Sequence, residues 1–239
     1  MNEIELAYQV SGWGEESFIS ALADIASVGY RGIEVGARIV ELYEDRVPVF
    51  QEILAEHKLE LAAVISGARA VNEETQEYEI ERAVNISRFL ERVGSGKLIL
   101  YPPIRRPEIV YTAEDFNLLF ATYNMIGERC AELNAVISIH PETGTVIEKE
   151  KDIDELLKNT KPERVGLTAD IGHLTFSGIA PHLYLKKRLD RINHIHFKDV
   201  APDKEKEKEK TDAKPVAKKS QRATKSQRAS QSQIGRAHV

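Results

Sequence analysis

Acidic, imidazole and lysine side chains follow the apolar segments of this chain, close to the point where each segment ends. These residues are Glu34, His140, Glu142, Glu148, Asp170, His173, His194, His196, Lys198 and Asp199. Carboxylates together with imidazoles are a ligand set for divalent cations such as Mn²⁺, Mg²⁺, Co²⁺ or Zn²⁺. Such a cation could hold two adjacent sugar oxygens, polarise a carbonyl and lower the cost of removing a proton from the neighbouring carbon.

Two motifs carry the densest part of this pattern. Asp170 and His173 stand three residues apart in "TADIGHLTFSG", and "INHIHFKDV" follows shortly after it. His194 and His196 alternate in the second motif, so on a strand they share one face. Four separate segments bearing such groups favour one shared site over four unrelated structural roles.

Individual residues also have structural explanations. Asp170 could be the N-cap of the following turn, because Asp is a common cap. One of the two strand histidines could be a hydrogen-bonded core residue. Lys198 and Asp199 could form a solvated pair after the strand, and Glu34 could support the site rather than bind a ligand.

The elements that must position these residues alternate along the chain. Period-two apolar patterns predict strands in 3–10, 30–36, 59–66, 96–102, 135–141, 164–170 and 191–199. Helical periodicity predicts helices in 15–29, 47–58, 75–94, 112–134, 150–160 and 178–190. Thr112, with Asp115 three residues later, is a predicted N-cap.

Alternating strands and helices predict a parallel sheet with right-handed crossovers, in the α/β class. A doubly wound sheet competes with a (β/α)₈ TIM barrel. The turn "QVSGWGEES" lacks the third glycine of a dinucleotide-binding fingerprint, which weakens the first option. We favour the barrel, because all strand ends of a barrel face one site. Only seven units precede Asp199, so we expect the barrel to be truncated after its seventh strand.

Charge and composition narrow the class of protein. Residues 201–239 contain 11 basic and 5 acidic side chains, which gives them a net charge of +6. Because the whole chain has a net charge of −5, residues 1–200 have a net charge of −11. An acidic body argues against a nucleic-acid partner. The chain has no run of eighteen apolar residues and no signal-peptide pattern, so we expect no membrane partner and a cytoplasmic location. The single Cys130 fits a reducing compartment and a core position.

We predict two parts: an incomplete barrel in residues 1–200 and a low-complexity basic tail in residues 201–239. The tail alternates Lys and Glu, repeats "SQRA" and holds almost no apolar residues, so we expect it to be disordered. Its final "IGRAHV" matches one frame of a common sequencing adapter, which favours an artefact over a natural interaction arm. An unclosed barrel also exposes two edges, which invites homo-oligomers.

Four motifs resemble the xylose-isomerase-like TIM-barrel superfamily, in its sugar-phosphate isomerase/epimerase and inosose-dehydratase branch. They are "GYRGIEVG", "IHPETGTVIE", "VGLTADIGHLTFSG" and "INHIHFKDV", and with the strand spacing they cover residues 4–200. The resemblance implies one divalent metal ion held by a Glu, an Asp, a His and a second Glu from the fifth to eighth strand regions. The eighth-strand ligand has no counterpart among residues 1–200.

Carried over residue by residue, the implied metal ligands are Glu148, Asp170 and His196, with Glu142 as the alternative to Glu148. The family often has His at position 142, so that choice stays open. Glu148 and Lys198 are the implied catalytic residues. We assign substrate binding to His173, His140, Glu34 and His194.

The resemblance implies proton transfer next to a carbonyl of a sugar, sugar phosphate or polyol. Isomerisation, epimerisation and dehydration all begin in this way, and the residues do not separate them. One alternative is a catalytically inactive, incomplete barrel that binds a ligand or uses its basic tail on an acidic partner. Another is a metal-dependent abasic-site endonuclease, which the −11 body opposes.

Overall fold

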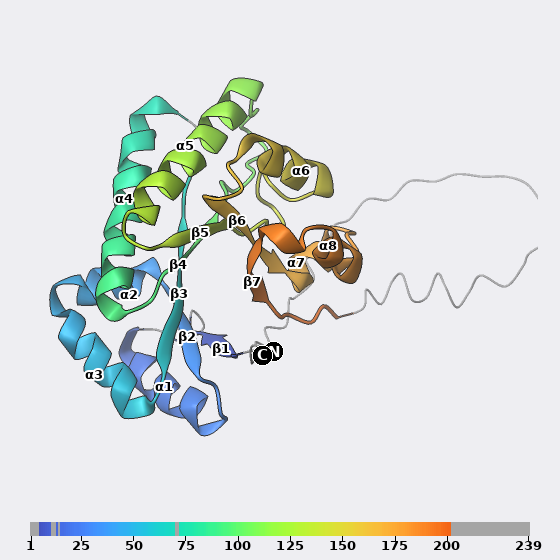
Figure 1. Ribbon diagram of the computed structural model, residues 1–239. Helices are drawn as coiled ribbons and strands as arrows, with labels where there is room; N and C mark the ends of the chain where they lie inside the picture. Colours follow the sequence, from blue (N-terminus) through green and yellow to red (C-terminus); the bar gives the residue numbers. More distant parts are fainter. Residues whose placement is uncertain (1–4, 11–12, 14, 70–71, 202–239) are drawn as a thin grey trace, which may run out of the picture.

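The structure is a computed structural model that describes residues 5–10, 13, 15–69 and 72–201. Its centre is one sheet of seven strands, hydrogen-bonded in chain order and all parallel (Figure 1). The strands are β1 Ala7–Gln9, β2 Gly32–Gly36, β3 Glu60–Gly67, β4 Lys97–Tyr101, β5 Val136–Ile139, β6 Val165–Asp170 and β7 Ile192–His196. The α-helices are α1 Phe18–Ser27, α2 Ala37–Tyr43, α3 Val47–His57, α4 Glu73–Val93, α5 Ala113–Ala131, α6 Glu150–Asn159, α7 Ile171–Phe176 and α8 Pro181–Lys187.

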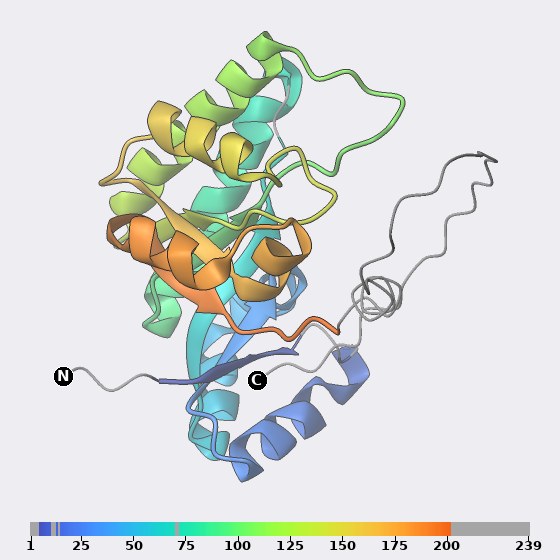
Figure 2. The same cartoon turned by 90° about the vertical axis from the view of Figure 1, so that its right-hand side faces the viewer.

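The sheet curls into a partial barrel, with α3, α4 and α5 along its convex side (Figure 1). Figure 2 looks onto the side where the edge strands β1 and β7 lie. The curl is tight enough for His196 of β7 to contact Glu34 of β2 across the interior. The predicted α/β class, the barrel architecture and the seven strands are therefore confirmed.

Strand register sorts the side chains onto two faces. Val35, Val64 and Leu98 point outward, are buried and belong to the hydrophobic core beneath the helices. Residues on the inner face alternate with these. They are Gln9, Glu34, Ala63, Ile65, Gly67, Ile99, Tyr101, Ser138, His140, Gly166, Thr168, Asp170, His194 and His196. The inner face thus collects the predicted site residues near the carboxyl ends of the strands.

Helix ends show how the chain fixes its crossovers. The Thr112 hydroxyl accepts a hydrogen bond from the Asp115 backbone N–H, and the Asp115 carboxylate accepts one from the Thr112 N–H, so the predicted cap is confirmed as a capping box. Helix α4 ends at Gly94 in the left-handed region, where glycine has no Cβ penalty.

The prediction differs from the structure at three helices. The helix predicted in 178–190 is shorter, because Gly178 adopts a left-handed φ of 80° and α8 runs only from Pro181 to Lys187. The six-residue helix α7 was not predicted. Neither was the seven-residue helix α2. Its N-cap, Gly36, makes no side-chain hydrogen bond, so the usual sequence signal for a helix start is missing.

Cys130 is buried and burial raises its thiol pKa, which agrees with a core role. No helix in the described ranges is long and apolar enough to cross a membrane. The prediction of a disordered or artefactual tail falls on residues 202–239, outside the described residues.

Candidate functional site

Asp170 ends β6 and uses its two carboxylate oxygens differently. Oδ1 accepts a hydrogen bond from the His173 backbone N–H at 2.9 Å, which caps α7. Oδ2 lies 2.7 Å from Lys198 Nζ, 3.3 Å from His140 Nε2 and 3.6 Å from His196 Nδ1. Asp170 therefore caps α7 with Oδ1 and is available to the site with Oδ2.

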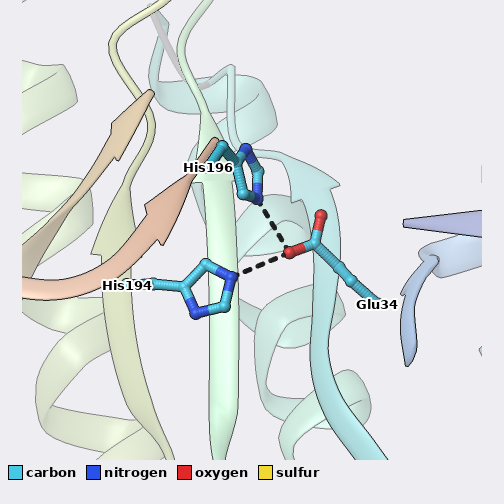
Figure 3. Close-up of side chains that lie close together, drawn as sticks. All are labelled: Glu34, His194 and His196. Atoms are coloured by element: carbon cyan, nitrogen blue, oxygen red, sulfur yellow. Dashed lines mark hydrogen bonds and ion pairs between the residues drawn. The ribbon is translucent and has the colours of Figure 1, made fainter. Parts of the chain in front are cut away.

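His196 lies between two carboxylates. Its Nε2 is 2.8 Å from Glu34 Oε2 (Figure 3), while its Nδ1 faces Asp170. His194 Nε2 approaches the same Glu34 oxygen at 3.2 Å, as the alternation of the two histidines predicts. The Gln9 side-chain amide donates to Glu34 Oε1 at 2.7 Å. Both carboxylate oxygens of Glu34 therefore have polar partners, Oε1 from β1 and Oε2 from β7.

These contacts shift the ionisation of the buried groups. Burial by itself would raise the pKa of Glu34, but hydrogen bonds from His194 and His196 hold it well below its usual range. Burial likewise opposes ionisation of Asp170, and the adjacent His140, His196 and Lys198 side chains outweigh it and lower its pKa. Burial would lower the pKa of His196, yet the flanking Asp170 and Glu34 carboxylates raise it to about 9. Both carboxylates are therefore ionised at neutral pH, and without a metal His196 is protonated.

His173 lies beside this cluster, in α7. Its Nδ1 accepts a hydrogen bond from the Thr143 backbone N–H at 3.4 Å, and its Nε2 is 3.5 Å from both Glu142 Oε1 and Lys198 Nζ. Burial lowers the pKa of His173, more than the nearby Asp170 carboxylate raises it. His173 is therefore neutral at pH 7, with Nε2 as its hydrogen-bond donor.

Two fifth-strand carboxylates were candidates for one ligand position, and the structure places them differently. Glu142 Oε2 is 3.9 Å from His140 Nδ1. Glu148 instead accepts from the Gly144 backbone N–H at 3.1 Å and pairs with Lys149 at 2.6 Å. Among the contacts of the described residues, none joins Glu148 to Asp170 or His196. Burial opposes ionisation of Glu148, while Lys149 and the Gly144 N–H lower its pKa.

The structure thus brings together most of the predicted site residues, from β2, β6, β7 and the segments that follow β5, β6 and β7. They are Glu34, His140, Glu142, Asp170, His173, His194, His196 and Lys198. Lys198 contacts Asp170, so it does not form the solvated pair with Asp199 that was one option. Glu148 stands apart from this group.

The family model described as "Xylose isomerase-like TIM barrel" matches residues 22–223. The chain belongs to this family. The resemblance inferred from the four sequence motifs is therefore confirmed.

Among curated proteins of the xylose isomerase-like family, an inosose dehydratase of Geobacillus thermodenitrificans is 30% identical over 219 residues, which is 83% of this chain and 72% of that protein. An inosose dehydratase of Clostridium botulinum is 28% identical over 79% of this chain. The chain spans only 65% of the length of the Clostridium protein.

Solved structures of the xylose isomerase-like fold align over most of the chain. The probable 3-DHS dehydratase AsbF of Bacillus anthracis gives a TM-score of 0.71 at 17% identity, covering 83% of this chain and 74% of its own. The 3-keto-D-glucoside 4-epimerase YcjR of E. coli gives 0.70 at 15%, covering 82% and 80%. The IOLI protein, solved with a zinc atom, gives 0.66 at 14%, covering 83% and 75%. These likenesses establish the fold.

The donor atoms of the site fit a divalent cation. His140, Asp170 and His196 offer one ligand atom each within 4.8 Å of one another, and Glu34, His194 and His196 form a second such group. Nδ1 of His140 and Nδ1 of His196 are buried without a hydrogen-bond partner among the described residues. A bound ion is one of the explanations for a buried polar atom without a partner, and both nitrogens could coordinate a cation.

Three residues in or beside the site were not predicted from the sequence. Gln9 pairs with Glu34 in the β1–β2 register, and a single Gln in a short strand carries no recognisable signal. Tyr101 and Arg69 stand at the carboxyl ends of β4 and β3, so the strand-end criterion that selected the other residues would have found them.

Proposed function

We propose that this chain binds one divalent metal ion through Asp170 and His196, with a third ligand from the segment after β5. That segment offers His140, Glu142 and Glu148. The contacts of Asp170 Oδ2 and the unpartnered His196 Nδ1 support the first two ligands. The structurally similar IOLI protein was solved with a zinc atom, which supports a bound cation in this fold.

We further propose that the protein acts on a ketone of a sugar or polyol, by removing a proton from the carbon beside the carbonyl. When bound, a divalent ion would supply Lewis acidity to that carbonyl. Glu148 is the proposed base, with Glu142 as the alternative carboxylate. Glu142 is supported by its position 3.5 Å from His173 Nε2.

The remaining groups suit the oxygens of such a substrate. Lys198, whose ammonium lies 2.7 Å from Asp170, can give a proton to a departing hydroxide, which then leaves as water. His173 is neutral and its Nε2–H can donate a hydrogen bond to a substrate hydroxyl. Dehydration is our preferred outcome, because the curated relatives quoted above are inosose dehydratases.

The observation that carries this proposal is the convergence of His140, Asp170, His196 and Lys198 at the carboxyl ends of β5, β6 and β7. Catalytic residues of (β/α)₈ barrels lie at that face. The carboxylates and imidazoles at this face support the same location for the proposed chemistry.

The test uses two ketone probes in D₂O, neutral inosose and anionic fructose 6-phosphate, with Mn²⁺ or Co²⁺ added to the purified chain. Proton removal replaces the hydrogen beside the carbonyl by deuterium, which proton NMR detects whichever reaction follows. Mass spectrometry then separates dehydration, which lowers the mass by one water, from epimerisation, which leaves the same composition. An Asp170→Asn variant corrects for spontaneous exchange.

We expect metal binding by calorimetry, metal-dependent exchange and loss of water. A Lys198→Met variant should still exchange deuterium but lose water more slowly. Metal binding without exchange would favour the alternative of a non-catalytic binding protein. Absence of both metal binding and exchange would refute the proposal.

A further inference from the structure

Beside the site, an arginine and a tyrosine stand together at the carboxyl ends of β3 and β4. Arg69 Nη2 donates a hydrogen bond to the Tyr101 hydroxyl at 2.9 Å. The guanidinium carbon lies 5.1 Å from the centroid of the Tyr101 ring, within the range of a cation–π contact. These two contacts fix both the position and the plane of the Arg69 head group.

Gly67 leaves the space that Arg69 occupies. Gly67 pairs with Tyr101 in the β3–β4 register, so both positions face the inside of the curl. A Cβ at Gly67 would lie 2.9 Å from Arg69 Nε and 3.1 Å from two atoms of the Tyr101 ring. The Arg69 side chain therefore folds over the inner face of β3 and does not extend away from the sheet.

This arginine adjoins the proposed active site. The His140 backbone N–H donates to the Leu100 carbonyl at 2.8 Å, which makes His140 the neighbour of Tyr101 on the inner face. Adjacent strands lie about 5 Å apart. A substrate that reaches His140 and Asp170 therefore extends over Tyr101 within the length of a small sugar.

The charge of Arg69 is not neutralised by an ion pair. No carboxylate of the described residues lies within 4.0 Å of its guanidinium, and Arg69 is exposed. The Glu79 carboxylate accepts a hydrogen bond from the Arg69 backbone N–H and attracts the Arg69 charge from beyond ion-pair distance, so it leaves the N–H groups of the guanidinium free of a carboxylate contact. An exposed guanidinium with one edge held by a tyrosine has further N–H groups oriented for an incoming anion.

We propose that Arg69 and Tyr101 form an anion subsite, which binds a carboxylate or phosphate group at the end of the substrate remote from Asp170 and His196. This inference rests on the proposed function for the location of the reacting carbon. It narrows the substrate class to anionic sugars and polyols, that is, sugar acids or sugar phosphates. A neutral ring would form no charge-assisted hydrogen bond with the guanidinium.

The test compares two probe pairs that differ in charge: fructose 6-phosphate against fructose, and gluconate against glucose. Calorimetry on the Mn²⁺-loaded chain gives the affinity of each. We expect at least one anionic probe to bind about tenfold more tightly than its neutral counterpart, since a charge-assisted hydrogen bond contributes at least that factor. The pair that shows the preference distinguishes phosphate from carboxylate.

Two variants assign the preference to its source. Arg69→Gln should abolish it, and Arg69→Lys should retain part of it. Arg106→Gln, which removes an exposed arginine from the loop after β4, is the matched control and should keep it in full. The inference is overturned if the unaltered chain prefers neither anion or if Arg69→Gln keeps the preference.

The outcome is separable from that of the proposed function. Mn²⁺ affinity should be the same in the Arg69→Gln variant and in the unaltered chain, because Arg69 offers no metal ligand. A charge preference without metal-dependent exchange would leave the subsite standing and remove the enzyme. Metal-dependent exchange without a charge preference would support the proposed enzyme function and refute the anion subsite.

Discussion

Replacing Glu34 by Gln tests how the inner face is held together. Glu34 Oε2 receives two imidazole nitrogens, at 2.8 Å from His196 and 3.2 Å from His194, and the Glu34 side chain is 3% exposed. Breaking a buried ion pair by removing one partner costs about 3–5 kcal/mol. The Gln amide oxygen still accepts one neutral hydrogen bond, worth about 1 kcal/mol. We therefore expect the free energy of unfolding to fall by about 3 kcal/mol at pH 6.

The loss should depend on pH in a defined direction. The folded-state pKa of His196 is raised from 6.5 to about 9. Stability from a raised histidine pKa is fully present below 6.5 and is lost as the pH rises through 9. Since Glu34 contributes to that rise, the difference between the two proteins should shrink between pH 6.5 and pH 10.

Urea unfolding of the metal-free proteins at pH 6 and pH 9.5 measures both quantities. A Glu77→Gln variant is the control. This substitution removes the same charge from an exposed ion pair with Arg129 and should lower the free energy of unfolding by about 0.5 kcal/mol or less. A loss below about 0.5 kcal/mol for Glu34→Gln, or a difference that grows with pH, would refute the reasoning.

Three further predictions follow from the site and the core. Asp170→Asn should weaken Mn²⁺ binding at least about a hundredfold in calorimetry. It should also lower the thermal midpoint of the metal-free protein, because Asn keeps the cap of α7 but leaves Lys198 and protonated His196 without their buried carboxylate; an unchanged midpoint would contradict the contacts of Oδ2. Mn²⁺ affinity should rise between pH 6 and pH 9, by up to about tenfold per unit, because His196 must release its proton to coordinate; a flat profile would exclude His196 as a ligand. Gly127→Ala should lower the free energy of urea unfolding by about 1–3 kcal/mol, because the new Cβ would lie 2.8 Å from the Arg164 carbonyl oxygen; an unchanged midpoint would show that β6 can shift.

The sequence was informative about the fold because its periodicity reflects burial directly. Strand β6, "VGLTAD", is buried at every position, and the two-residue spacing of His194 and His196 placed both on the face that contacts Glu34. Helix α2 and the break at Gly178 were not predicted, because each depends on backbone geometry at a glycine that has several allowed conformations.

Within the candidate site, residue types could be predicted but distances could not. The spacing of Asp170 and His173 allowed a cap or a ligand, and only the coordinates show one oxygen in each role. The choice between Glu142 and Glu148 depends on the path of the loop after β5, which the turn at Gly144 and the Ile104–Thr145 bridge determine. Long-range contacts of this kind cannot be predicted from the periodicity of the local sequence.

The contact between Glu34 and His196 joins positions 162 residues apart, which has a consequence for the order of folding. Contacts of such sequence separation form late, because the closure entropy of the intervening chain must be paid first. Until β7 docks, the Glu34 carboxylate has no imidazole partner. Its charge is then more stable in contact with water than buried inside the sheet. During synthesis on the ribosome, the inner face of β2 therefore stays hydrated until β7 has emerged, and only then does Glu34 gain its imidazole partners.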